Sequence, residues 1–283
     1  MHRESLFMHD TVPLPLLVFG LLAVGSVITG VLLWLRDGFQ KKTTVPLYVK
    51  PLEIRWYIVV LLGGAFFIIP SLIQLTGVLR QIQGSSVEHF FYSGVLVEFA
   101  LVLFFLAVTA VSKKVRDGLQ GGDFLMRLCV CGFLKILPLV LVTGLLWVPI
   151  LNGLRRCGLP IQIEIQPLMK LLLQGQASTW SLAAIGCGAI ILAPICEEIF
   201  FRGILLRFFY SFLPLTKSLW VSSFIFAAMH GNWMAFLPIA VVGYQLGRNY
   251  AESRNLVVGI GIHGLFNAFN FTLAVMYARF YAV

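Results

Sequence analysis

Long apolar runs separated by short polar segments dominate the chain. A run of about 17–25 apolar residues can cross a bilayer as a helix, and in lipid the backbone must satisfy its own hydrogen bonds, which favours helices. The apolar runs cover residues 13–35, 56–79, 91–111, 125–150, 182–210, 218–230, 233–246 and 256–277. We therefore predict an all-α, polytopic transmembrane bundle of about eight spans. Since the sixth and seventh runs are short, seven spans is the alternative.

The composition agrees with this prediction. Hydrophobic residues make up 59% of the chain and charged residues only 12%, against about 45–50% and about 25% in soluble domains. The net charge of +9 is scattered over short loops, so we expect no nucleic-acid partner. We predict one integral membrane domain over residues 1–283, surrounded by the lipid bilayer of a prokaryotic plasma membrane.

Basic residues in the loops predict the orientation. Loops 36–55 and 112–127 are rich in Lys and Arg, and Arg207 and Lys217 continue this side. Such loops face the cytoplasm, which puts both termini outside it. The segment 161–173 is either an amphipathic piece on the membrane surface or a plain solvated loop.

Within the fifth apolar run, the stretch ILAPICEEIFFRGILL contains three charged residues: Glu197, Glu198 and Arg202. Each costs about 2.5–3.5 kcal/mol in a bilayer, so we expect them to face a polar interior cavity. Glu198 and Arg202 are four residues apart with the acid first, which favours an ion pair. Glu197 points about 100° away around the helix, and a free carboxylate suits a general base that activates water. The alternative is a purely structural ion-pair cluster.

Two histidines and an amide lie in later runs. His263 and Asn267 are four residues apart on one helical face, and His230 ends the sixth run. Each could be an interhelical hydrogen-bond partner; together with the carboxylates they indicate one polar cavity. Pro194 can kink or open the helix beside it. Glu98, in the third run, is expected to make a helix-packing hydrogen bond, with a substrate contact as the alternative.

This set of groups suits peptide hydrolysis. Glu197 can take the proton of a water molecule, and His230 can orient the water or pass the proton to the leaving amine. His263 and Asn267 can donate to the oxyanion. We expect no metal or other cofactor, because no H-E-x-x-H pair is present. Zinc held by His230, His263 and Glu197 is the alternative.

Three short motifs occur in order on apolar runs: E-E-x3-R from Glu197, F-x3-H from Phe226 and H-x3-N from His263. Residues 180–275 thereby resemble the catalytic core of the type II CAAX prenyl endopeptidase family, also called the CAAX protease and bacteriocin-processing family. Residues 1–150, the N-terminal spans, resemble nothing specific.

The resemblance implies an eight-helix, glutamic-type intramembrane protease with a conical cavity. It implies that Glu197 is the catalytic base and that His230 helps to activate water. His263 and Asn267 would form the oxyanion site, supported by the predicted ion pair.

We therefore predict an endopeptidase that cleaves near the C-terminus of a membrane-associated peptide or protein, either lipidated or apolar. Because the family includes members tied to immunity or scaffolding, a non-catalytic membrane scaffold or bacteriocin immunity protein is the alternative. A proton-coupled transporter that uses Glu197 and the histidines as a relay is a third. Inverted halves would favour transport, but the polar residues cluster in the C-terminal third.

Overall fold

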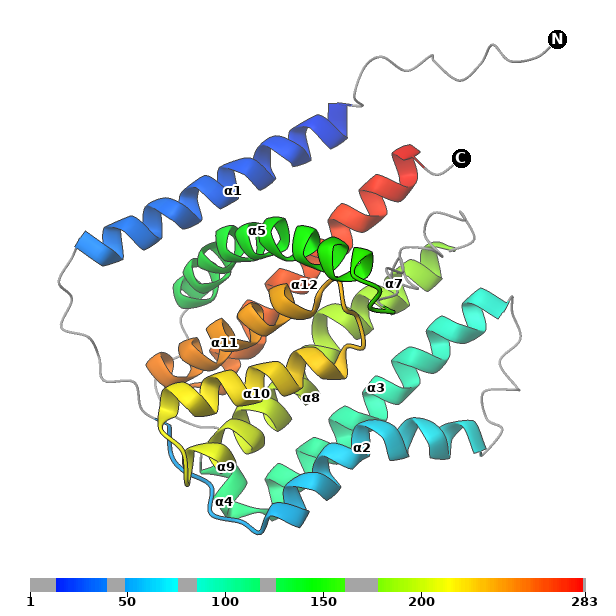
Figure 1. Cartoon of the computed structure of the whole chain (residues 1–283). Helices are drawn as coiled ribbons and strands as arrows, with labels where there is room; N and C mark the ends of the chain where they lie inside the picture. The colour runs from blue at the N-terminus through cyan, green and yellow to red at the C-terminus, as the bar shows by residue number, and fades with distance from the viewer. Residues whose placement is uncertain (1–13, 40–48, 76–85, 118–125, 161–177, 282–283) are drawn as a thin grey trace.

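The computed structural model describes residues 14–39, 49–75, 86–117, 126–160 and 178–281 (Figure 1). Within these ranges the chain forms helices and no strand, which confirms the predicted all-α class. The segment 161–173, predicted to lie on the membrane surface or in a loop, falls outside the described residues. In chain order the helices are α1 (Leu14–Phe39), α2 (Trp56–Leu75), α3 (Ser86–Val111), α4 (Lys113–Arg116), α5 (Met126–Arg156), α7 (Thr179–Cys187), η2 (Gly188–Leu192), α8 (Ala193–Glu198), η3 (Ile199–Leu206), α9 (Arg207–Tyr210), α10 (Leu215–Met229), α11 (Phe236–Ser253) and α12 (Leu256–Tyr281).

The expected number of spans is consistent with these helices. Six segments of the described chain are long and apolar enough to cross a membrane, namely 17–37, 56–73, 92–111, 126–156, 179–210 and 256–279. The two short predicted spans correspond to α10, of 15 residues, and α11, of 18 residues. The chain is therefore an integral membrane protein.

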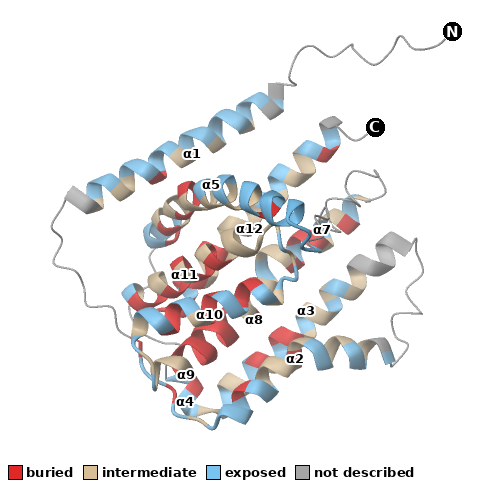
Figure 2. Ribbon diagram, viewed as in Figure 1, coloured by how far each residue is buried: buried red, intermediate tan, exposed pale blue. Residues whose placement is uncertain are grey.

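The outer helices expose apolar side chains. Leu21 on α1 is 66% exposed and Trp56 at the start of α2 is 67% exposed. Figure 2 shows exposed residues along α1 and α2, whereas buried residues concentrate where α8, α10 and α11 meet. Large exposed apolar faces mark contact with lipid or another protein, so these outer faces are the ones that meet the acyl chains.

A row of aromatic rings fixes the central helix in place. Phe66 on α2 and Phe105 on α3 lie 5.3 Å apart, and Phe66 lies 5.4 Å from Phe200 on η3. The row continues from Phe200 to Phe201 at 5.0 Å and on to Phe226 of α10 at 4.9 Å. Pairs at such distances add about 0.5–1.5 kcal/mol each beyond area burial. Helices α2, α3 and α10 are thereby packed around η3, which directly follows the glutamate-bearing α8.

Arg207 lies inside the protein, which corrects its assignment as a loop charge that sets topology. Its side chain is buried, with 1% exposed. Its guanidinium donates hydrogen bonds to four backbone carbonyls, those of Lys50, Lys114, Val115 and Gly203. These carbonyls belong to three separate parts of the chain, so Arg207 ties the start of α9 to the chain before α2 and to α4.

Candidate active site

The helix that carries the glutamates changes its hydrogen-bond register on both sides of them. Residues 188–192 and 199–206 form the π-helices η2 and η3, with α8 between them. At the end of η2 the Ala193 amide donates to the Gly188 carbonyl, five residues back. Pro194 follows and has no N–H to donate. The predicted disturbance at Pro194 is therefore a π-helix, a feature frequent at functional sites.

The predicted ion pair between Glu198 and Arg202 is present and buried. Arg202 Nη1 lies 2.6 Å from Glu198 Oε1, with the two side chains 3% and 0% exposed. Arg202 Nη2 donates to the Gly243 carbonyl of α11 at 3.0 Å, and its guanidinium carbon lies 4.6 Å from the Phe226 ring centre. Because breaking a buried charge pair typically costs about 3–5 kcal/mol, these contacts hold the Glu198 carboxylate in one position.

His263 connects the two glutamates. Its Nδ1 lies 3.0 Å from Glu198 Oε1, and its Nε2 lies 3.8 Å from Glu197 Oε2. Since a carboxylate can only accept a hydrogen bond, we assign the hydrogen to Nδ1. The Glu198 carboxylate therefore fixes the ring with Nε2 facing Glu197, as carboxylate partners orient catalytic histidines elsewhere.

Glu197 is the carboxylate that remains available for a ligand. Its side chain is 20% exposed, and its buried Oε2 has no hydrogen-bond partner. Arg202 pairs with Glu198 and not with Glu197, as the angular offset of the two acids predicts. A partly accessible carboxylate beside an oriented imidazole can accept a proton from a bound water molecule.

His230 lies at the C-terminal end of α10, next to this group. Its Nδ1 pairs with the Phe226 carbonyl at 2.8 Å, so Nδ1 is the donor and Nε2 can accept. The Phe226 ring packs against His230 at 4.7 Å and against His263 at 5.8 Å. His230 has no ion pair with a carboxylate in the described chain, and its connection to the other site residues runs through Phe226.

Asn267 faces the π-helix. Its Nδ2 donates to the Ala189 carbonyl at 2.7 Å. That carbonyl lacks a donor within its helix, because the Ala193 amide is used by Gly188 and residue 194 is proline. Asn267 thereby satisfies a carbonyl that Pro194 leaves free, and one of its amide hydrogens is committed to helix packing. Its predicted oxyanion role would use the other.

Glu98 differs from the prediction made for it. Its Oε2 is buried and has no hydrogen-bond partner, so it does not form the expected helix-packing hydrogen bond. It lies against Gly188, where an added Cβ would collide with it, and it interacts electrostatically with Glu197. The Gly243 carbonyl and the Phe226 ring also take part in the site. Phe226 was named in the sequence analysis only as the start of the F-x3-H motif, and Gly243 was not named because a glycine carries no signal for such a role.

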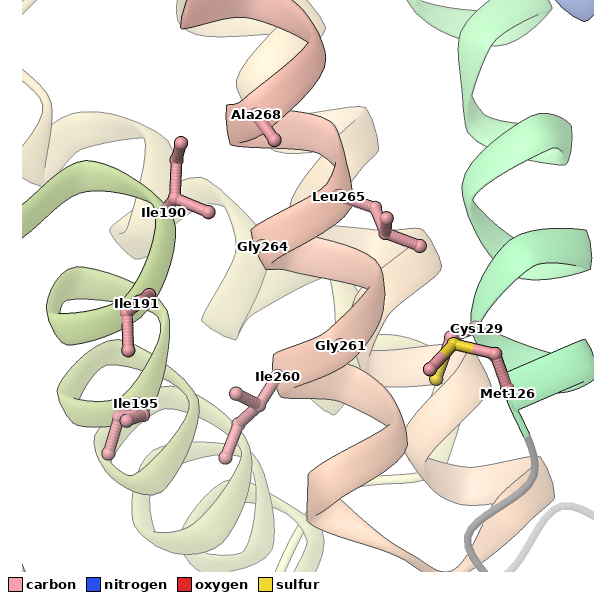
Figure 3. Close-up of a pocket in the computed structure, with 10 residues that line it drawn as sticks. All are labelled: Met126, Cys129, Ile190, Ile191, Ile195, Ile260, Gly261, Gly264, Leu265 and Ala268. Carbon is pink, nitrogen blue, oxygen red and sulfur yellow. The ribbon is translucent and has the colours of Figure 1, made fainter. Parts of the chain in front are cut away.

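An apolar pocket of about 310 Å³ lies near the glutamate-bearing helix (Figure 3). It is lined by residues of α5, of the η2–α8 segment and of α12. Figure 3 shows Ile190, Ile191 and Ile195 facing the α12 residues Ile260 and Gly264. None of the polar site residues lines this pocket, so it is separate from the carboxylate–imidazole cluster. Its apolar walls suit a hydrocarbon group.

Among the residues that the structure describes, no group of three or more His, Cys, Asp or Glu side chains is arranged to hold a metal ion. The hydrogen bond of His230 and its ring contact are both with Phe226.

The fold and the site together define an integral membrane protein with a buried glutamate–histidine–arginine cluster in its C-terminal part. Residues 179–269 match the family model of type II CAAX prenyl endopeptidase Rce1-like proteins, so the chain contains an Rce1-like domain over this range. The matched range agrees with the catalytic core predicted at residues 180–275. Because this is a family of CAAX proteases, the match supports the prediction that the protein is a peptidase. Neither the curated proteins nor the solved structures gave a match to the chain.

Proposed function

We propose that this protein is an intramembrane endopeptidase that hydrolyses a peptide bond near the C-terminus of a membrane-associated protein or peptide, with water activated by Glu197. The observation that carries the proposal is the position of His263 between Glu197 and Glu198, at 3.8 Å and 3.0 Å. A merely structural ion pair would not need a second, unpaired carboxylate facing the other imidazole nitrogen.

In the proposed reaction Glu197 takes a proton from water, and the resulting hydroxide attacks the carbonyl carbon of the substrate. The tetrahedral intermediate carries its negative charge on the former carbonyl oxygen, where His263 Nε2, when protonated, and the second amide hydrogen of Asn267 can donate. When the C–N bond breaks, the proton returns from Glu197 to the leaving amine, directly or through His230. Losing one oxyanion donor typically costs about 100- to 1000-fold in rate.

Glu198 and Arg202 support these steps without touching the substrate. Arg202 holds the Glu198 carboxylate, and this carboxylate holds the Nδ1–H of His263. Fixed dipoles and charges that need no rearrangement are the main source of electrostatic catalysis in water-excluded sites. The proposal requires no metal, because every proton transfer has a protein group to perform it.

The apolar pocket favours substrates with a hydrocarbon part. Its walls come from isoleucines, glycines and other small or apolar residues, which suit a lipid chain or an apolar helix. We accordingly include lipidated proteins among the substrates, and we expect the enzyme in a prokaryotic plasma membrane.

The decisive experiment compares the C-terminal peptides of membranes that contain the wild-type protein with those that contain Glu197→Gln. The substitution keeps the side-chain volume and removes the base, so we expect the cleaved C-termini to disappear. Glu252→Gln is the matched control, since Glu252 is an exposed residue paired with Arg248 on the surface of α11.

Unchanged cleavage with Glu197→Gln would contradict the proposal and favour a non-catalytic scaffold or immunity protein. A pH gradient dissipated by the purified protein, and abolished by the same substitution, would favour a proton-coupled transporter.

A further inference from the structure

Glu98 is a charged residue that the proposed reaction does not use. It is the only charged residue in the span 92–111, where a charge is costly and marks a functional site by default. Its Oε2 is buried with no hydrogen-bond partner. A buried polar group without a partner destabilises a protein, so its presence needs an explanation outside helix packing.

The structure provides space for this carboxylate beside η2, on the same continuous helical segment that carries the proposed base. Helix α3 packs along α7, η2 and α8 (Figure 1). Residue 188 of η2 is glycine, and a Cβ at that position would collide with Glu98 Oε2. Helix α3 also contacts α8, the short helix that carries Glu197. Since α3 precedes the matched range 179–269, the Rce1-like domain itself does not account for this residue.

The charges around the site do not balance. Three carboxylates, those of Glu98, Glu197 and Glu198, each have one buried oxygen without a partner. The guanidinium of Arg202 donates hydrogen bonds to Glu198 and to the Gly243 carbonyl. In the proposed reaction Glu197 binds the water nucleophile, and Glu198 already pairs with Arg202 and His263. Among these three carboxylates, Glu98 is the one that has no hydrogen bond or ion pair within the described residues and no role in the proposed reaction.

A cation from outside the protein would complete this site. Ionised carboxylates only accept hydrogen bonds, and a charge-assisted bond to an ammonium or guanidinium is about twice as strong as a neutral one. We propose that Glu98 determines specificity by binding a positively charged group of the substrate, a lysine or arginine side chain close to the scissile bond. This inference rests on the proposed peptidase function, and it identifies the substrate class as a membrane peptide with a basic residue near its cleavage site.

The test uses the full-length protein in lipid nanodiscs and a set of peptides that carry an S-alkylated cysteine. In each peptide one position near the cysteine is Lys, norleucine or Glu; norleucine has nearly the shape of lysine without the charge. At the best position we expect the wild-type kcat/KM for Lys to exceed that for norleucine by about 10- to 100-fold. Glu98→Gln should remove this preference, mainly by raising KM for the Lys peptide, and Glu98→Lys should favour the Glu peptide.

Three results would overturn the inference. They are equal cleavage of Lys and norleucine peptides by the wild type, an unchanged Lys preference in Glu98→Gln, and an equal loss for every peptide in Glu98→Gln. The last two would mean that Glu98 acts as a neutral hydrogen-bonding or packing group. Glu252→Gln again serves as the control for an exposed glutamate.

Binding separates this inference from the proposed function. The affinity of the same peptides for the Glu197→Gln protein, measured by fluorescence anisotropy, does not require turnover. A Lys preference of about tenfold that vanishes in the double variant Glu98→Gln/Glu197→Gln supports the inference even if no peptide is hydrolysed. Equal Kd values for the Lys and norleucine peptides would refute it while leaving hydrolysis intact.

Discussion

The hydrogen bond from Asn267 to the Ala189 carbonyl should stabilise the fold because Pro194 has no N–H that could donate to this carbonyl. The Ala193 amide is already used by Gly188, and Pro194 has no N–H, so Asn267 Nδ2 supplies the donor at 2.7 Å. In Asn267→Ala the carbonyl loses this donor. In the background of Pro194→Ala, the new N–H of residue 194 points toward Ala189 in the π register and can replace it.

The expected loss of stability in Asn267→Ala depends on whether the hydrogen bond lies in a soluble protein or within a membrane. An unsatisfied buried carbonyl costs about 1–3 kcal/mol in soluble proteins, whereas interhelical hydrogen bonds in membranes average about 0.6 kcal/mol and reach about 1.7 kcal/mol. We therefore expect Asn267→Ala to lower the free energy of unfolding by about 1–2 kcal/mol. With Pro194→Ala the same substitution should cost under about 0.5 kcal/mol, which gives a coupling of about 1 kcal/mol.

The assay is reversible unfolding of the full-length protein in mixed micelles, followed by far-ultraviolet circular dichroism, for the wild type, both single variants and the double variant. Asn270→Ala is the matched control, since Asn270 is exposed and bonds to Phe266 within its own helix. Equal costs of Asn267→Ala in both backgrounds would refute the coupling to Pro194. A loss of kcat with no change in stability would assign Asn267 to the oxyanion alone.

Two further predictions concern packing around the site. Arg207→Met removes four hydrogen bonds to backbone carbonyls and should lower the unfolding free energy by about 2–4 kcal/mol. If it costs no more than Arg248→Met, a substitution of an exposed arginine, these hydrogen bonds do not stabilise the fold. Gly264→Ala places a Cβ 2.8 Å from the Ile190 carbonyl oxygen, so α12 must move away from η2. We expect the free energy of unfolding to fall by about 1–3 kcal/mol and the peptidase activity to be reduced. Gly144→Ala, which meets open space on α5, should be neutral or stabilising in the same unfolding assay.

Local sequence patterns determine the helices and part of the site. Apolar runs of bilayer length must form helices, because no water is present to satisfy the backbone, and the predicted spans agree with the helices for this reason. The ion pair of Glu198 with Arg202 was equally predictable, since residues four apart on one helix are neighbours whatever surrounds them. The motifs that begin at Glu197, Phe226 and His263 indicated the family of the domain.

Other features depend on contacts between segments far apart in the chain. The sequence contains no signal that Glu98 of α3 would lie against Gly188, because its neighbours in the chain are apolar and its position is set by packing along η2. Nothing in the sequence around Arg207 distinguishes it from an arginine in a loop, yet it donates hydrogen bonds to the carbonyls of Lys50, Lys114 and Val115.

The sequence alone determined the membrane environment and the helices, and it supplied the side chains that we propose as chemically active, since each of these follows from residues within about one helical turn or one span. Only the tertiary structure decided which imidazole nitrogen faces Glu197, which carbonyl Asn267 satisfies and which carboxylate has no partner. Those depend on the π register around Pro194 and on how α3, α10 and α12 pack against it, and side-chain packing between distant segments is not encoded in any local pattern.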